Sequence, residues 1–125
     1  MTLRRYTVSV TTASDGSATA YSPYLSGYIE SIHYQKTDFA DGVDFTITLE
    51  ATGESLWTES NVNAAASRYP AAPTHSGAGV AALYAAGGTA VQRKMAASRD
   101  RVKIVIAQGG ATKTGTFVIV VDDGR

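Results

Sequence analysis

The sequence of this protein is most regular at residues 43–50, which read Val43-Asp44-Phe45-Thr46-Ile47-Thr48-Leu49-Glu50. Apolar residues take every second position of this stretch, and Asp, Thr or Glu takes each position between them. This alternation is typical of a β-strand that buries one face in a core and exposes the other face to water. A short link through Gly53 leads to a second β-prone run at residues 55–58, so the two runs are predicted to form a hairpin.

The residues that precede this hairpin predict two more strands. Residues 6–11 alternate in the same way, and the Asp and Gly within residues 14–17 predict a turn after them. Residues 24–34 form an aromatic-rich run that we also interpret as a strand. The alternation of this run slips between Ile29 and Ile32, which is the pattern that a β-bulge produces.

Three further strands are predicted near the end of the chain, at residues 91–96, 101–107 and 115–121. The last two are apolar on nearly both faces, as strands in the middle of a sheet are. Residues 108–113 contain two adjacent glycines and are predicted to join these two strands as a hairpin loop. The side chains expected in the core are Phe45, Ile47, Ile104, Ile106, Phe117 and Ile119.

The segment at residues 61–88 differs from the rest of the chain because it consists largely of Ala, Gly, Pro and Ser. Residues 80–86 within it are compatible with about two turns of helix that end at the glycines that follow. Loops longer than about 12 to 15 residues usually carry function or cover another part of a protein. We therefore expect an interaction loop whose contact residues are Tyr69, Leu83 and Tyr84.

These patterns together predict an all-β fold in a single domain, residues 1–125. The length suits one domain with a core of its own. Short strands with Gly-rich turns and little helix are typical of an antiparallel β-sandwich, either jelly-roll-like or a small barrel. The Ala/Gly/Pro-rich segment at residues 61–88 is expected to leave this sandwich as a long loop excursion.

The composition argues against several kinds of binding. Eleven basic and eleven acidic residues give a net charge of zero, so no overall field draws nucleic acid, an anionic membrane or an acidic substrate to the protein. The chain has no cysteine, which excludes disulfides, thiolate catalysis and Cys-based zinc sites. The first residues lack the apolar run of a signal peptide, and no segment is long and apolar enough to span a membrane, so we expect synthesis in the cytosol.

The titratable residues do not form a recognisable catalytic or metal-binding motif. His33 and His75 have no carboxylate beside them at a ligand spacing, so we interpret both as structural. Asp38, Asp41 and Asp44 recur at every third position and lack the alternating spacing of an EF-hand. We expect these three residues to shape a turn.

Two short motifs lie together in the Gly-containing part of the long segment. Residues 77–82 match the relaxed dinucleotide fingerprint G-x-G-x-x-A, but a segment with Pro73 precedes them in place of the required hydrophobic strand. Ser76 stands beside His75 without a third group to orient that base. We therefore predict that the protein is not an enzyme and has no catalytic residue, cofactor, metal site or small-molecule substrate.

Several segments that together span most of the chain carry a family resemblance. They are Ser26-Gly27-Tyr28-Ile29-Glu30-Ser31-Ile32, Asp41-Gly42-Val43-Asp44-Phe45-Thr46-Ile47, Tyr69-Pro70 with Pro73-Thr74-His75, Asp100-Arg101-Val102-Lys103-Ile104-Val105-Ile106-Ala107-Gln108-Gly109-Gly110, and Lys113-Thr114-Gly115-Thr116-Phe117. In these segments the chain resembles a family of small virion structural proteins of tailed bacteriophages. The resemblance implies an assembly role in the phage particle, with synthesis in the bacterial cytoplasm and final location in the virion. It implies no catalytic residues.

The leading hypothesis within this family is a capsid decoration, or cement, protein that binds the assembled head as a homo-oligomer and stabilises it. Its partners would be the major capsid protein or other virion proteins, and neither nucleic acid nor a membrane. The alternative within the virion is a neck or tail component that joins the head to the tail. A rival from another class is a carbohydrate-binding module, suggested by four aromatic residues that we expect to be exposed, Tyr21, Tyr24, Trp57 and Tyr69.

Two arginines near the N-terminus complete the set of candidate contact residues. Arg4 and Arg5 lie beside the first predicted strand, and arginine forms bidentate bonds to carboxylates on a partner. The alternative is that both are solvated terminal charges.

Overall fold

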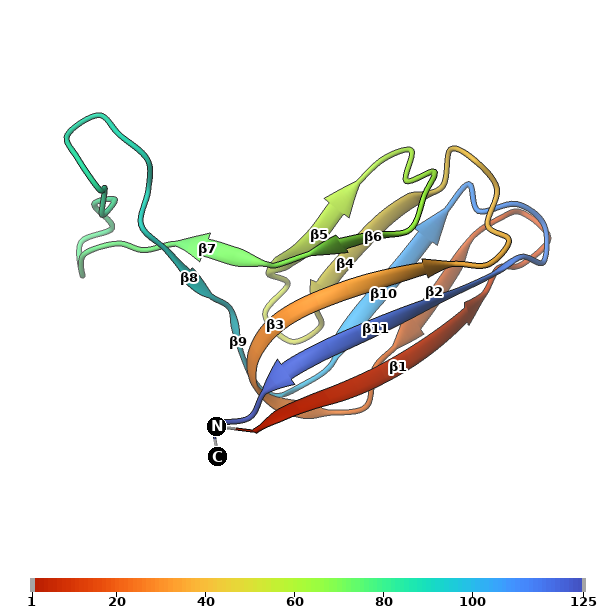
Figure 1. Cartoon of the computed structure of the whole chain (residues 1–125), viewed down its shortest axis with the longest axis horizontal. Coiled ribbons are helices and arrows are strands. Elements are labelled where there is room, and N and C mark those ends of the chain that lie inside the picture. The colour runs from red at the N-terminus through yellow and green to blue at the C-terminus, as the bar shows by residue number, and fades with distance from the viewer. Residues whose placement is uncertain (1, 125) are drawn as a thin grey trace.

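The computed structural model describes residues 2–124 and contains only strands, turns and loops in that range. Two antiparallel sheets pack face to face, and a two-stranded arm projects from one end of them (Figure 1). The predicted all-β sandwich is thereby confirmed. No helix within residues 2–124 has the length and hydropathy that crossing a membrane requires.

The first sheet is built on three long strands. In spatial order they are β1 (Leu3–Thr11), β11 (Thr114–Asp122) and β3 (Leu25–Lys36), and all neighbours are antiparallel. Two short strands, β6 (Ala66–Arg68) and β9 (Ala96–Asp100), pair with different parts of β3. The sheet therefore has β1 alone along one edge and two short strands along the other.

The second sheet has four strands in the order β2 (Ala18–Tyr21), β10 (Val102–Ala107), β4 (Asp44–Leu49) and β5 (Ser55–Glu59). β4 and β5 are consecutive in the chain and pair as the predicted hairpin. β10 and β11 are both flanked on two sides, as their apolar composition predicts.

The core lies between the two sheets and contains side chains from both. All six predicted core residues are at most 1% exposed, so the predicted strand faces are confirmed. Phe45 of β4 and Phe117 of β11 meet edge to face with their ring centroids 5.0 Å apart. Tyr34 of β3 packs against both rings, at 4.8 Å from Phe45 and 5.3 Å from Phe117. This cluster joins the sheets, because its rings come from both of them.

The predicted bulge in β3 is present. Ser31 pairs with Val120 of β11, but the next pair along the ladder joins Ile29 to Val121, so Glu30 is the extra residue. A one-residue insertion shifts the alternation by one position. Ile29 and Ile32 can therefore both face the core, where each is 0% exposed.

The prediction that residues 108–113 form a hairpin loop is wrong. This loop does not join two paired strands, because β10 belongs to the second sheet and β11 to the first. The loop crosses from one sheet to the other, with the Gly109 amide donating to the Gly16 carbonyl at 2.9 Å and the Gly109 carbonyl accepting from the Ala40 amide at 2.9 Å. The alternation of a strand reports which face is buried and carries no information on which strand lies beside it.

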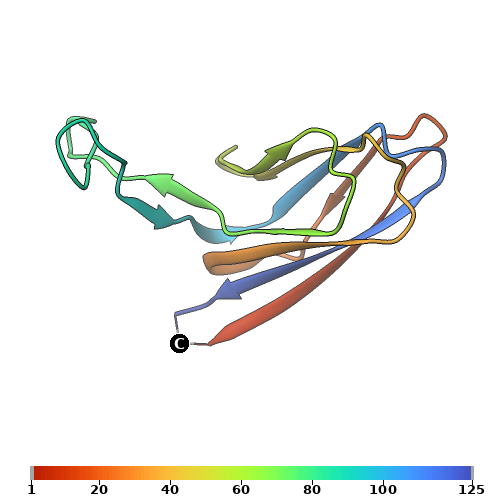
Figure 2. The same cartoon turned by 45° about the horizontal axis from the view of Figure 1, so that its top comes forward.

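Only the later part of the long segment leaves the sandwich, and with the residues that follow it forms the arm, which we define as residues 71–94. The prediction is wrong for residues 61–70, because Val62 is buried in the core and β6 pairs with β3. The base of the arm is the ribbon of β7 (Ala71–Pro73) and β8 (Gln92–Lys94), and the rest projects well beyond the two sheets (Figures 1 and 2). The predicted strand at residues 91–96 is divided between β8 and β9, with Met95 between them.

The prediction of helical turns at residues 80–86 is wrong. These residues form a bent segment that makes two isolated β-bridges, His75 to Ala81 and Leu83 to Ala90. So short a helix is marginal in water unless it packs against a core. The arm provides no core, and backbone pairing with its neighbours takes the place of helical hydrogen bonds.

Candidate assembly interface

The arm is fixed to the sandwich at its two ends. Pro70, just before the arm, and Met95, just after it, are both buried. None of the side chains of residues 71–94 between them is buried. The arm is therefore an ordered element with no hydrophobic core of its own.

Backbone hydrogen bonds hold the arm in shape. The Ala82 amide donates to the Thr74 carbonyl at 3.0 Å, and the Ala82 carbonyl accepts from the Val91 amide at 2.9 Å. The chain thus folds back so that residue 82 lies between the outgoing and returning segments. The Ser76 hydroxyl oxygen accepts from the amides of Ala78 and Val80 at 3.3 and 3.2 Å.

The arm carries no formal charge up to residue 92, and several apolar side chains are exposed on it. Residues 71–92 contain no Asp, Glu, Lys or Arg. Val80 is 67% exposed, Leu83 is 40% exposed and Tyr84 is 75% exposed. Tyr69, at the root of the arm, is 69% exposed. Two of the predicted contact residues, Leu83 and Tyr84, are therefore accessible on the arm. Tyr69 is accessible just before the arm, where its ring meets that of His33 edge to face.

Charged residues gather where the arm meets the sandwich. The Arg93 guanidinium donates to the Tyr28 hydroxyl at 2.5 Å and lies over the Tyr28 ring, and Lys94 pairs with Glu30, the extra residue of the bulge. This pairing raises the pKa of Lys94. An open hollow of about 480 Å³ lies beside these residues and is lined by both strands of the arm and by Glu54. The contacts to β3 set the direction in which the arm leaves.

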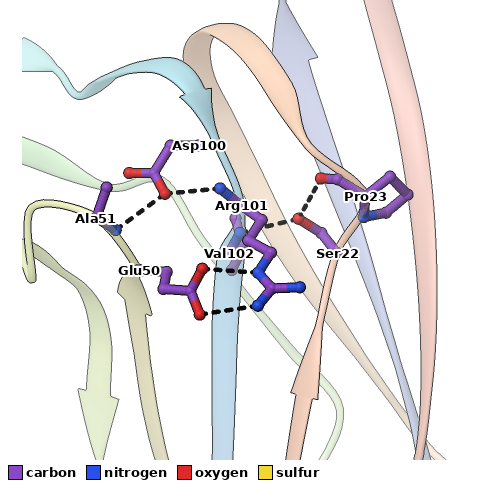
Figure 3. Close-up of polar contacts among 7 residues, drawn as sticks. All are labelled: Ser22, Pro23, Glu50, Ala51, Asp100, Arg101 and Val102. Atoms are coloured by element: carbon purple, nitrogen blue, oxygen red, sulfur yellow. Dashed lines mark hydrogen bonds and ion pairs between the residues drawn. The ribbon is translucent and has the colours of Figure 1, made fainter.

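A second polar cluster joins three chain segments at one end of the sandwich, as Figure 3 shows. Nε and Nη2 of Arg101 donate to the two carboxylate oxygens of Glu50 at 2.7 and 3.0 Å. The buried carboxylate of Asp100 accepts from the backbone amides of Ala51 and Arg101 at 3.0 and 2.7 Å. The hydrogen bonds from Arg101 lower the pKa of Glu50. This cluster fastens the β4–β5 turn to the start of β10.

Tyr21 and Tyr24, two of the aromatic residues that suggested carbohydrate binding, pack against Arg101 of this cluster. The Arg101 guanidinium lies 3.9 Å from the ring centroid of Tyr21 and 5.2 Å from that of Tyr24. The Ser22 hydroxyl between them accepts from the Val102 amide at 2.8 Å and donates to the Pro23 carbonyl at 2.9 Å (Figure 3). The two rings therefore have a cation to stack on within the chain itself.

Trp57 does not lie at the surface. It is 4% exposed, packs against Phe45 and donates from its indole nitrogen to Glu59 at 2.9 Å. Its assignment as an exposed aromatic is wrong, because the period-2 pattern of so short a strand does not reveal that both Leu56 and Trp57 are buried. The four aromatic residues of the carbohydrate hypothesis thus do not form one platform.

The predicted contact residues fall into two separate places. Arg4 and Arg5 lie on β1, at the opposite margin of the first sheet from the root of the arm (Figure 1). Arg4 donates to the Asp123 carboxylate at 2.6 Å, which raises the pKa of Arg4. Arg5 is exposed on the strand. Arg4 is therefore paired within the chain and not a fully solvated charge.

The two histidines have different surroundings. The ring of His33 is hydrogen-bonded at both nitrogens, to the Ser31 hydroxyl at 2.9 Å and to the Ser67 hydroxyl at 2.6 Å. This arrangement joins β3 to β6, and the sequence did not reveal it because Ser67 is 34 residues away. His75 is exposed on the arm. Across residues 2–124, no cluster of three or more His, Asp or Glu side chains is placed to hold a metal ion.

The three aspartates shape the turn region before β4, as predicted. The Asp44 carboxylate accepts from the Asn61 amide at 3.0 Å, and the Asp38 carboxylate accepts from the Thr114 amide at 2.5 Å. Asp41 pairs with Lys36 at 3.2 Å. Each carboxylate has a different partner, so the three do not converge on one point.

Comparisons with models of protein families, with curated proteins and with solved structures found no match to this chain.

Proposed function

We propose that this protein is a structural component of a tailed-bacteriophage particle, a capsid decoration protein whose arm attaches it to the assembled shell. The observation that carries the proposal is the arm itself. It is ordered, it projects from the sandwich, and none of its side chains is buried. Its surface between residues 71 and 92 has no charged residue.

Such an arm needs a partner surface. A two-stranded ribbon without a core is only marginally stable in water by itself. Contact surfaces between proteins are depleted of charged residues, as residues 71–92 are. Tyr84, Leu83 and Val80 supply exposed apolar area between β7 and β8. A groove between neighbouring capsid subunits would bury this area and hold the arm in one conformation.

The stabilising effect follows from mass action. A protein that binds the assembled shell, and not the separated subunits, shifts the equilibrium toward the shell. The copies on a symmetric particle act together, so a modest free energy of binding per arm becomes large for the whole head. No chemistry is required for this role.

A neck or tail position is the second candidate, because an apolar arm would serve there equally well. The number of copies in the particle separates the two candidates. Densitometry of purified particles should show an amount comparable to the major capsid protein for a decoration protein, and about a dozen copies for a neck protein. The carbohydrate hypothesis has less support, because Trp57 is buried and Tyr21 and Tyr24 stack on Arg101.

Shortening the arm tests the proposal. Pro73 and Gln92 already face each other across the ribbon, so residues 74–91 can be replaced by Asn-Gly, which forms a tight two-residue turn. We expect a folded protein that no longer cosediments with particles lacking their own copy of this protein. Particles mixed with the shortened protein should survive heating no better than particles without it.

Two point variants provide the matched control. Tyr84→Ser removes an exposed aromatic ring from the arm, and Tyr24→Ser removes a similarly exposed ring from the sandwich. We expect Tyr84→Ser to weaken binding to the particles and Tyr24→Ser to leave it unchanged. Full binding of the shortened protein, or equal loss in the two point variants, would contradict attachment through the arm.

A further inference from the structure

The edge strand β1 differs from every other sheet edge of the sandwich. It is 9 residues long, and its ladder with β11 runs without a register shift from Leu3 to Thr11. The other edge strands have 3 to 5 residues, and the ladders of β5 and β9 are interrupted by register shifts. Long, regular edges readily pair with another strand, and proteins usually shorten or bend them. β1 is neither shortened nor interrupted by a register shift.

The hydrogen bonds at the two ends of β1 show which of its backbone groups are unpaired. The Thr12 amide donates to Lys113 at 2.8 Å, and the Thr2 carbonyl accepts from Asp123 at 3.0 Å. Because bonding alternates along an antiparallel ladder, the even-numbered residues face β11 and the odd-numbered residues face outward. The outward amides and carbonyls belong to Leu3, Arg5, Thr7, Ser9 and Thr11. No other strand within residues 2–124 pairs with this side of β1 (Figure 1).

We infer that β1 pairs with β1 of a second copy of this chain, antiparallel and around a two-fold axis at Thr7. This register brings every outward-facing residue opposite another outward-facing residue. Thr7 faces the partner's Thr7, Arg5 faces the partner's Ser9, and Leu3 faces the partner's Thr11. The first sheet then continues through both copies, which is the β-augmentation mode of recognition. A two-fold pairing of this kind is closed and does not grow into a fibre.

Charge selects this register over its neighbours. Arg5 is the one charged residue with outward-facing backbone groups, and a two-fold axis centred on it would place two arginines directly opposite each other, which is unfavourable. An axis at Ser9 would leave Leu3 and Arg5 without a pairing residue in the partner's strand. The axis at Thr7 uses the full strand and places no arginine opposite another. The inference goes beyond the proposed function and does not depend on the arm.

A single cysteine tests the axis. The chain has no cysteine, and residues that exchange hydrogen bonds across an antiparallel ladder have their Cα atoms about 5.5 Å apart, which suits a disulfide. Thr7→Cys should therefore form a covalent dimer under mild oxidation. Thr46→Cys is the control, because Thr46 is also exposed but lies on β4, which has a strand on each side. Equal cross-linking of the two variants would overturn the inference.

A charge pair tests the register. In the dimer, residue 9 faces the partner's Arg5, so Ser9→Glu should tighten association and Ser9→Lys should weaken it. Because the dimer is two-fold symmetric, each substitution changes two cross-strand pairs at once. We therefore expect roughly a 2- to 30-fold change in the dimer dissociation constant for each variant. Sedimentation equilibrium measures this constant directly. Changes of the same sign in both variants, or a protein that stays monomeric at every concentration, would overturn the inference.

The protein with the shortened arm distinguishes a failure of this inference from a failure of the proposed function. We expect it to dimerise as tightly as the unchanged protein, although it no longer binds particles. If shortening the arm abolishes the dimer, the arm and not β1 holds the copies together, and the inference is overturned while attachment through the arm stands. If the shortened protein dimerises and still binds particles, the proposed function fails and the inference stands.

Discussion

Tyr34 has a hydroxyl group for which the core provides no partner. Its ring lies among Phe39, Phe45 and Phe117, and its oxygen is buried without a hydrogen bond from any residue in the range 2–124. An unsatisfied buried polar group costs about 1 to 3 kcal/mol. We therefore expect Tyr34→Phe to raise the free energy of unfolding by about 1 kcal/mol, measured by urea denaturation. A loss of stability would show that the hydroxyl does have a partner.

The same substitution should change the response to alkaline pH. Burial raises the pKa of Tyr34 from 10.0 to about 12. The folded state therefore favours the protonated phenol, and the stability linked to it is complete below pH 10 and lost as the pH rises toward 12. Tyr34→Phe has no such group, so its advantage over the unchanged protein should grow between pH 10 and 12. A constant difference across this range would contradict the buried position of the hydroxyl.

Phe117 and Phe45 each fill space between the sheets. Both are at most 1% exposed, and each meets the other and Tyr34 in the aromatic cluster. Truncation of a fully buried phenylalanine to alanine typically costs about 3 to 5 kcal/mol. We expect Phe117→Ala and Phe45→Ala each to lower the free energy of unfolding by this amount in chemical denaturation. Losses below about 1 kcal/mol would mean that neither ring is well packed.

At the scale of the element, the arm and the sandwich differ in what stabilises them. The strands of the sandwich have buried side chains, whereas the arm has no buried side chain and is held mainly by hydrogen bonds. Segments with few buried contacts open locally without unfolding of the whole protein.

We therefore expect the amides of residues 74–91 to exchange with deuterium much faster than those of β10 and β11 in the isolated protein. Hydrogen exchange read by mass spectrometry measures both regions in one experiment. Binding to the particle should slow exchange in the arm, because the partner then supplies the missing buried contacts. Arm amides as slow as those of β10 in the isolated protein would contradict this account.

At the scale of the whole molecule, the charge balance predicts how attachment responds to salt. The net charge is zero and the arm from residue 71 to 92 has no charged residue, so long-range attraction contributes little. We expect binding to the particle to persist in moderate salt, measured by cosedimentation across a salt series. Release in moderate salt would indicate charge pairing, for which Arg5 on β1 is the exposed candidate.

Much of the strand content followed from the sequence alone. Alternation is a local property, so it correctly placed Phe45, Ile47 and Phe117 in the core. The slip between Ile29 and Ile32 marked the bulge at Glu30 for the same reason. The unusual composition of residues 61–88 also marked the region that contains most of the arm.

Strand neighbours were decided only in the tertiary structure. Alternation does not distinguish a hairpin from a crossing between sheets, so the loop at residues 108–113 was misassigned. It also cannot show that no strand in the described range, residues 2–124, pairs with one side of β1, or that Trp57 is buried. These properties depend on contacts between residues far apart in the chain, such as β1 with β11. The face of a strand is set by neighbouring residues, whereas its partner is set by the packing of the whole chain.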